Sequence, residues 1–151
     1  MAMTGLMALL SGVPAVAGET AAASVEVSAR LWGETSLYFS LVLRHPKRLD
    51  VPLDSLPWGA FPDLQMVAVR AEDGVVLPRT SSSGEPVESP VTKLVAGQDL
   101  HGRVPLTEVA DDLAEALRVS DVIVFWSFRL RVPGASPSNR TGGWVVVPRV
   151  K

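Results

Sequence analysis

The sequence contains no cysteine, and this absence excludes several kinds of chemistry. Without thiols the chain can form no disulfide framework, no thiolate zinc site and no cysteine nucleophile. An excess of either charge is also missing, since 14 Lys and Arg residues stand against 16 Asp and Glu residues. A net charge of -2 does not favour binding to phosphate backbones or anionic lipid, so we expect no nucleic-acid partner.

Long apolar runs are missing as well. No stretch reaches the roughly 20 apolar residues that a membrane-spanning helix needs, so we expect no membrane span. Residues 1–17 contain a shorter apolar stretch and end in Ala15-Val16-Ala17, the small-x-small form of a signal-peptidase site before Gly18. Because no Lys or Arg precedes this stretch, a flexible leader is the alternative. We predict a signal peptide in residues 1–17 and an extracytoplasmic protein, periplasmic or secreted.

Catalytic motifs are also absent from the sequence. The chain has two histidines, His45 and His101, and no Gly-x-Ser-x-Gly sequence for either to serve as a base. It has no His-x-x-x-His spacing and no glycine-rich phosphate loop with a lysine. We therefore predict a non-enzymatic protein with no cofactor and no metal. A hydrolase is a third alternative, which requires a histidine within hydrogen-bond reach of a serine or an acid.

What the chain does contain is alternation of apolar and polar residues with a period of two, which is typical of strands with one buried face. The clearest examples are residues 24–31 and 37–44, which a short turn at Gly33 joins into a hairpin. Weaker strand patterns occur at residues 64–71, 75–77, 91–95 and 100–106.

The end of the chain predicts a second hairpin. Residues 122–132 and 144–150 have strand patterns, and residues 133–143 between them are rich in Gly, Pro, Ser and Asn, as in a loop. The shared parity of apolar positions on the long strands predicts a buried core. Its central members are expected to be Phe39, Leu41, Trp126, Phe128 and Leu130.

Residues 107–118 alone have helical spacing of apolar residues, with Thr107 as a candidate N-cap. We predict one short helix that crosses from one sheet to the other. Roughly eight strands, one crossing helix and no alternation of strands with helices predict an all-β fold, a two-sheet antiparallel sandwich. We expect residues 24–151 to form its single domain.

From residue 37 to residue 150, the strand pattern with Trp126 in a late core strand resembles bacterial immunoglobulin-like and fibronectin type III-like modules. The resemblance concerns architecture alone, since the cysteine pair of antibody-type domains is absent. It implies an immunoglobulin-like sandwich that serves as a binding or structural module. It names no ligand and carries over no catalytic motif.

Two loops supply the residues that we select as a candidate binding site. Trp58 lies in the proline-rich loop 51–62, where a tryptophan either anchors a ligand or, as we favour, plugs one end of the sandwich. Asn139 and Arg140 offer hydrogen bonds and one cation, and Trp144 follows as a stacking surface. If all four lie at one end, they form a small site for a sugar or a peptide. Replacing Asn139 and Arg140 with Ala is expected to leave stability nearly unchanged.

These features predict a binding or structural module that recognises a protein or a glycan through its end loops. The alternative is a peptidase inhibitor that uses loops 51–62 and 133–143 as a wedge. It requires the two loops to lie side by side at one end of the sandwich. Neither the ligand nor the oligomeric state follows from the sequence.

Overall fold

The computed structural model describes residues 22–34, 36–60, 62–79 and 89–151. Their secondary structure is mostly β, and every paired strand is antiparallel to its neighbour, which confirms the prediction of an all-β protein. The predicted signal peptide or leader, residues 1–17, lies outside the described residues. Within the described part of the chain, no helix has the length and apolar character needed to cross a membrane.

One three-stranded sheet, which we call the β2 sheet after its central strand, consists of β1 (Ser24–Trp32), β2 (Ser36–His45) and β6 (Asp99–Pro105), in the order β1-β2-β6. The predicted first hairpin is confirmed, since Leu31 lies opposite Leu37 and Gly33 turns the chain with a φ of 60°. Glycine adopts this φ without the clash that a Cβ would cause. Alternate residues of β2 are buried, as the period of two predicts.

The β2 sheet continues into a second pair of strands, β3 (Arg48–Pro52) and β5 (Val91–Val95). Between the two ladders, Ala96 donates its backbone N–H to the carbonyl of Lys47 at 2.8 Å, so the interrupted ladder stays hydrogen-bonded. Both strands predicted between residues 91 and 106 are confirmed. The sequence pattern does not predict β3, because its proline and its basic neighbours are more typical of loops.

The other three-stranded sheet, which we call the β7 sheet, consists of β4 (Leu64–Arg70), β7 (Val122–Phe128) and β8 (Thr141–Val147), in the order β4-β7-β8. The predicted terminal hairpin is confirmed, with shifted boundaries, since β7 ends at Phe128 and β8 begins at Thr141 before Trp144. Gly143 belongs to β8, although glycine is typical of loops. A Cβ there would lie 3.2 Å from the ring of Trp126, so this glycine permits close packing.

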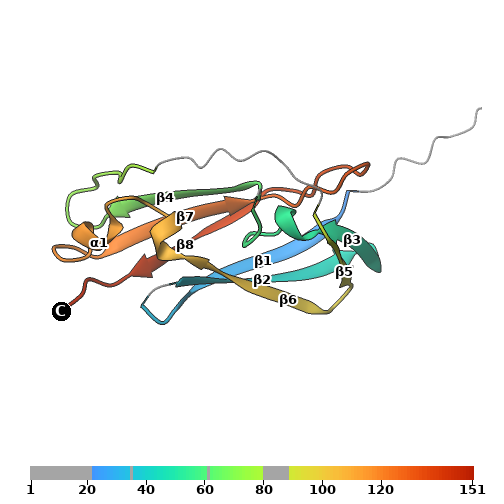
Figure 1. Cartoon of the computed structure of the whole chain (residues 1–151), viewed down its shortest axis with the longest axis horizontal. Helices are drawn as coiled ribbons and strands as arrows, with labels where there is room; N and C mark the ends of the chain where they lie inside the picture. Colours follow the sequence, from blue (N-terminus) through green and yellow to red (C-terminus); the bar gives the residue numbers. More distant parts are fainter. Residues whose placement is uncertain (1–21, 35, 61, 80–88) are drawn as a thin grey trace, which may run out of the picture.

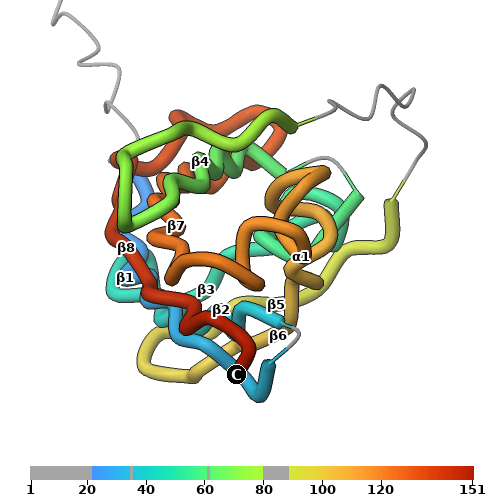
Figure 2. Tube along the Cα trace, turned by 90° about the vertical axis from the view of Figure 1, so that its left-hand side faces the viewer, coloured from blue at the N-terminus to red at the C-terminus, as the bar shows by residue number. Residues whose placement is uncertain are grey.

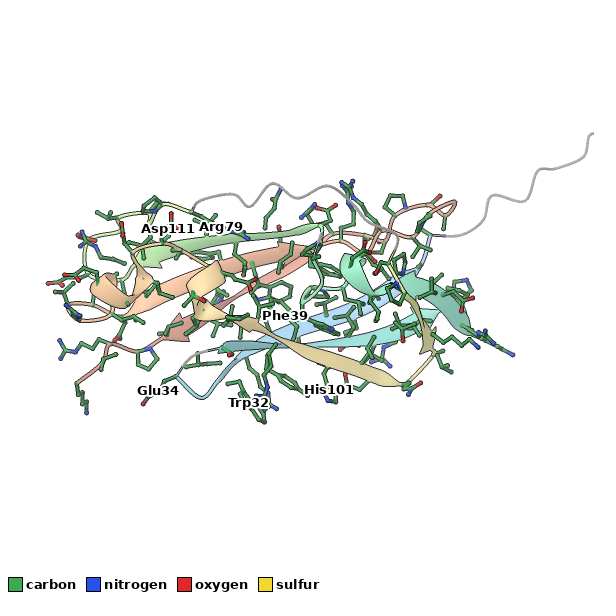
Figure 3. All side chains as sticks on the ribbon, in the orientation of Figure 1. Trp32, Glu34, Phe39, Arg79, His101 and Asp111 are labelled. Atoms are coloured by element: carbon green, nitrogen blue, oxygen red, sulfur yellow. The ribbon has the colours of Figure 1, made fainter. Side chains whose placement is uncertain are left out.

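The two sheets pack face to face as two layers (Figure 1 and Figure 2). Phe39 of β2 and Trp126 of β7 meet between them, with ring centroids 5.4 Å apart in an edge-to-face arrangement. Figure 3 shows Phe39 directed into the interior. The central core residues predicted from strand parity are confirmed, with at most 6% exposure: Phe39, Leu41, Trp126, Phe128 and Leu130.

The connection from β6 to β7 crosses between the sheets, as predicted, but the single helix predicted at residues 107–118 is wrong. The structure has a 3-10 turn, η2 (Leu106–Glu108), and one helical turn, α1 (Leu113–Ala116). Between them Asp111 donates its backbone N–H to the carbonyl of Pro78 at 3.1 Å. This tertiary hydrogen bond replaces the helical one, so the helix does not continue. In Figure 2, α1 lies on the side of the molecule opposite to β1 and β8.

Candidate functional site

Trp58 follows the short 3-10 turn η1 (Leu53–Ser55) and is directed inward. It is half-buried and packs against the core. A Cβ at Gly102 would lie 2.2 Å from Cδ2 of its indole, and Gly102 lies opposite the buried Phe39 on the inner face of the β2 sheet. The indole therefore covers Gly102 between the layers, which supports the interpretation of Trp58 as a plug.

Trp144 faces the solvent on the outer side of the β7 sheet. It is 64% exposed and lies opposite Phe125 of β7, which is 46% exposed. Phe125 in turn lies opposite Val67 of β4, another exposed residue. Directly opposite residues of antiparallel strands point to the same side, with Cβ atoms about 5 Å apart. One apolar row thus crosses all three strands.

A second apolar row runs beside the first. Ile123 lies between Val69 and Val146, and Val69 forms an isolated bridge to Val76. The strand predicted at residues 75–77 is reduced to this bridge. We call the two rows the apolar face, which consists of Val67, Val69, Val76, Ile123, Phe125, Trp144 and Val146. Contiguous exposed apolar residues, rimmed by polar ones, are typical of interaction sites.

Arg140 lies at the edge of the apolar face. Its guanidinium donates a hydrogen bond to the hydroxyl of Ser127, an outward residue of β7, at 3.1 Å. It also forms an ion pair with Asp63, which accepts further hydrogen bonds from Arg129 at 3.0 Å and Arg131 at 2.7 Å. We call Asp63 and these three arginines the arginine cluster. Because three cations surround one carboxylate, the cluster carries a net positive charge.

The carboxyl group of Asp63 is more acidic than that of an ordinary aspartate. Its side chain is 11% exposed. Burial by itself would raise its pKa, but hydrogen bonds from Arg140, Arg129 and Arg131 outweigh burial and lower the pKa from 3.8 to about 2. Asp63 is therefore ionised at neutral pH and holds the three guanidinium groups together.

The residues selected from the sequence separate into two groups. Arg140 and Trp144 border the same outer face, and the exposed Asn139 adjoins Arg140 in the loop, where its carbonyl accepts a hydrogen bond from Ser138. Trp58 packs on the inner side of the other sheet. The site predicted from all four residues is therefore not assembled, because the two tryptophan rings face different directions.

Loops 51–62 and 133–143 do lie side by side, although Trp58 of the first loop extends to the middle of the β2 sheet. They line one open groove with a volume of about 910 Å³, bounded by Pro52 on one side, Pro137 on the other, and Arg131. The inhibitor alternative requires this adjacency. The surface between the loops is nevertheless concave.

The outer face of the β2 sheet carries a group of side chains that sequence reasoning missed. Trp32 stacks on Tyr38 with centroids 5.2 Å apart, and Tyr38 stacks on His101 at 5.3 Å. Figure 3 shows Trp32 and His101 pointing away from the interior. The guanidinium of Arg30 lies 4.7 Å from the Tyr38 ring, and that of Arg103 lies 4.7 Å from the Trp32 ring. We call these five residues the cation-aromatic cluster.

Neither histidine is hydrogen-bonded to a serine or an acid among the described residues, as a hydrolase would require. His45 is exposed at the end of β2, His101 stacks on Tyr38, and neither side chain makes a hydrogen bond to the described residues. Within the described residues, the contact that the hydrolase alternative requires is not present. In the described part of the chain, no three His, Cys, Asp or Glu side chains are placed to hold a metal ion.

No protein-family model matches the chain, and no curated protein is significantly similar to it. The apolar face and the cation-aromatic cluster, on the outer sides of the two layers, are therefore the features from which a function is inferred.

Proposed function

We propose that this protein is an extracytoplasmic, non-enzymatic module with an immunoglobulin-like two-sheet sandwich, and that it binds a partner protein through the apolar face. The observation that carries the proposal is the exposure of Trp144 and Phe125 in one of two adjacent apolar rows. Two packed antiparallel layers with Trp126 in a late core strand support the resemblance to immunoglobulin-like and fibronectin type III-like modules. The proposed binding surface is thus the outer face of the β7 sheet, whereas the sequence had suggested the end loops.

The composition of the apolar face suits a protein better than a glycan. Burial of apolar area contributes about 25 cal/mol per Å², and tryptophan is prominent among residues that dominate protein interfaces. Trp144 alone can stack on a sugar ring, but Val67, Ile123 and Val146 around it offer no side-chain donor or acceptor for sugar hydroxyls. When an apolar surface of a partner protein covers these side chains, no hydrogen-bonding group is left without a partner.

The arginine cluster narrows the chemistry of the partner further. Arg131 is well exposed, and Arg129 and Arg140 are about one-third exposed, so the surplus positive charge reaches the solvent. A partner with acidic residues at the matching edge gains attraction and a faster encounter. We therefore expect the partner to present an apolar patch with an acidic border.

The peptidase-inhibitor alternative has weaker support. A wedge has to project into the cleft of a peptidase, whereas loops 51–62 and 133–143 line a concave groove. Such a groove is suited to receive a chain and not to enter a cleft. Nanomolar inhibition of a peptidase by the purified protein would establish the alternative.

The extracytoplasmic location rests on residues 1–17 and has a test of its own. We expect the exported protein to begin at Gly18, because cleavage follows the small-x-small site. Mass spectrometry of the intact exported protein measures its first residue. A product that begins at Met1 or Ala2 would reject cleavage.

Site-specific photo-cross-linking tests the apolar face. A photoreactive phenylalanine analogue in place of Trp144, in cells that make the protein, should form one discrete adduct with a second protein. Val119 is the matched control position, because it is 55% exposed but lies outside the apolar face. The analogue at position 119 should give no such adduct.

Phe125→Ser should abolish the adduct from position 144, since it removes the neighbouring ring while leaving the fold intact. Equal adducts from positions 144 and 119 would contradict the proposal. A cross-linked dimer of the chain itself would identify a second copy as the occupant and would also contradict it. Binding to a glycan array that Trp144→Ser abolishes would favour a sugar ligand instead.

A further inference from the structure

The cation-aromatic cluster lies on the outer side of the β2 sheet, where Figure 3 shows Trp32 and His101 directed away from the interior. Its residues come from three strands, with Arg30 and Trp32 on β1, Tyr38 on β2, and His101 and Arg103 on β6. The register places Arg30, Tyr38 and Arg103 in one row across the sheet. Because neighbouring strands lie about 4.8 Å apart, the backbone positions of the two arginines are about 10 Å apart.

The two arginines of this cluster have no carboxylate partner among the described residues. The acidic side chains of β1 and β6 on the same face are engaged elsewhere. Glu26 pairs with Arg44, and Asp99 accepts a hydrogen bond from the hydroxyl of Ser40. Asp99 keeps its charge, so Arg30, Arg44 and Arg103 stand against Glu26 and Asp99 on this face. One positive charge is in excess there, in a protein whose net charge is -2.

The aromatic rings hold these cations, although Trp32 keeps 39% exposure. Tyr38 lies between Trp32 and His101 in the stack, and Arg30 lies over both Trp32 and Tyr38, at 5.3 and 4.7 Å. Arg103 adds a second guanidinium to the Trp32 ring. Tyr38 already stacks on Trp32 and His101, so a sugar or a nucleobase would have to displace one of these rings to stack on it. The guanidinium N–H groups are what the cluster presents, and their fork matches a carboxylate.

We propose that the cation-aromatic cluster binds a carboxylate-rich, extended peptide segment of a protein partner. Side chains on one side of an extended peptide recur about every 6.8 Å, so two or three acidic residues of one segment can reach both Arg30 and Arg103. The rings already restrict the two guanidinium groups, which lowers the entropy lost on binding. This inference does not depend on the apolar face, and the two surfaces together would let the protein contact a partner on each side.

Fluorescence anisotropy with a defined probe tests the proposal. The probe is a labelled peptide of about ten alternating Glu and Ser residues, and its control is the same peptide with Gln in place of Glu. We expect the Glu peptide to bind at least about tenfold more tightly than the Gln peptide at about 50 mM salt. The difference should shrink at about 500 mM salt, because the contacts are exposed.

Matched variants locate the binding. Arg30→Gln with Arg103→Gln should weaken binding of the Glu peptide by about tenfold or more. Lys47→Gln with Lys93→Gln removes the same charge just before β3 and within β5, and should change binding by less than about twofold. Arg30→Lys with Arg103→Lys keeps the charge but loses the fork, so an intermediate affinity is expected.

Several results would overturn the proposal. Equal affinity for the Glu and Gln peptides, or equal losses in the two double glutamine variants, would exclude recognition of carboxylates by this cluster. Tighter binding of polygalacturonate or of single-stranded DNA than of the Glu peptide would assign the face to another class of polymer. Loss of peptide binding in Trp144→Ser would place the site on the apolar face, whereas unchanged binding there supports two separate surfaces.

Discussion

At the scale of single residues, Gly102 shows how a missing side chain permits a contact between distant parts of the chain. The alternation of β6 places position 102 on the inner face of the β2 sheet, opposite Phe39. A side chain would ordinarily fill that space. Because glycine leaves it open, the indole of Trp58 occupies it and closes the gap beside the core.

Gly102→Ala should lower the free energy of unfolding by about 1 to 3 kcal/mol, because the new Cβ would lie 2.2 Å from the indole of Trp58. In a Trp58→Ala background the same change should cost less than about 0.5 kcal/mol or stabilise the protein, since alanine restricts the unfolded chain more than glycine does. Urea unfolding of the four proteins measures the coupling. An equal cost in both backgrounds would show that the indole is not the cause.

Asp63 is the other residue whose role depends on its neighbours. The expectation that Arg140→Ala leaves stability nearly unchanged is revised, because Arg140 binds a carboxylate that is largely buried. Loss of this hydrogen bond should cost about 1 kcal/mol. For Asn139, which is exposed and outside the arginine cluster, the expectation of a nearly neutral replacement is unchanged.

The low pKa of Asp63 makes part of the stability depend on pH. The pKa is about 2 in the folded protein and 3.8 ordinarily, so the unfolded chain binds a proton first as the pH falls. The contribution of the carboxylate is complete above about pH 4 and is lost as the pH falls through about 2. With allowance for the exposed Arg131, it should amount to about 1 to 2 kcal/mol.

Asp63→Asn should therefore destabilise the protein at pH 7 by about that amount, and the difference from the wild type should vanish near pH 2. Urea unfolding of both proteins between pH 7 and pH 2 measures this difference. Asp73→Asn is a suitable control, because Asp73 forms an exposed ion pair with Arg70 alone. A constant difference at every pH would mean that the ionised carboxylate is not responsible.

At the scale of elements, β7 combines two roles in one strand. Its pairing with β4 and β8 places it in the centre of the β7 sheet, and its alternation sends Trp126 into the core and Phe125 into the solvent. The period of two is sufficient to predict the inward set. It does not explain why the outward set is also apolar, which a strand that faces only water does not require.

Replacement of Trp126 and of its neighbour Phe125 should therefore lower the free energy of unfolding by unequal amounts. Trp126→Ala should cost about 3 to 5 kcal/mol, because it leaves a cavity beside Phe39. Phe125→Ala should cost less than about 1 kcal/mol, since only cross-strand contacts are lost. Thermal or urea unfolding of both variants measures the costs. Similar costs would mean that the two faces of β7 are assigned wrongly.

The connection between β6 and β7 illustrates the opposite case, in which local pattern predicts the wrong element. Residues 107–118 have helical spacing, yet Val109 and Ala110 are buried and Asp111 bonds to the carbonyl of Pro78. Local propensity is worth a few tenths of a kcal/mol per residue, so one tertiary hydrogen bond with buried apolar contacts outweighs it. The apolar residues with helical spacing, Val109, Leu113, Ala116 and Leu117, are all buried, but the helix is only one turn long.

At the scale of the whole molecule, the two layers present different chemistry to the solvent. The β7 sheet shows apolar side chains, and the β2 sheet shows aromatic rings with arginines. The two outer faces are separated by the core between the layers. A substitution on one face should therefore leave the other face unchanged, as expected for well-separated sites.

The exposed apolar face should also affect solubility. Phe125→Ser with Trp144→Ser should raise the ammonium sulfate concentration at which the protein precipitates, because less apolar surface is available for association. Val119→Ser with Val150→Ser removes two exposed apolar side chains outside the apolar face and should have a smaller effect. Light scattering during a salt titration measures the threshold. An equal shift in both variants would show that the apolar face does not act as one patch.

The sequence by itself determined the all-β class, the two hairpins and the inward set of the core, because these depend on local alternation and turn residues. It also placed Arg30 and Tyr38 outward and selected Trp144 and Arg140. Only the tertiary structure decided what these residues meet. The pairing of β2 with β6 brings His101 and Arg103 to the same face as Arg30. Hydrogen bonds to Asp63 bring Arg129 and Arg131 together beside the β7 sheet. Such contacts depend on strand order, which local pattern does not contain.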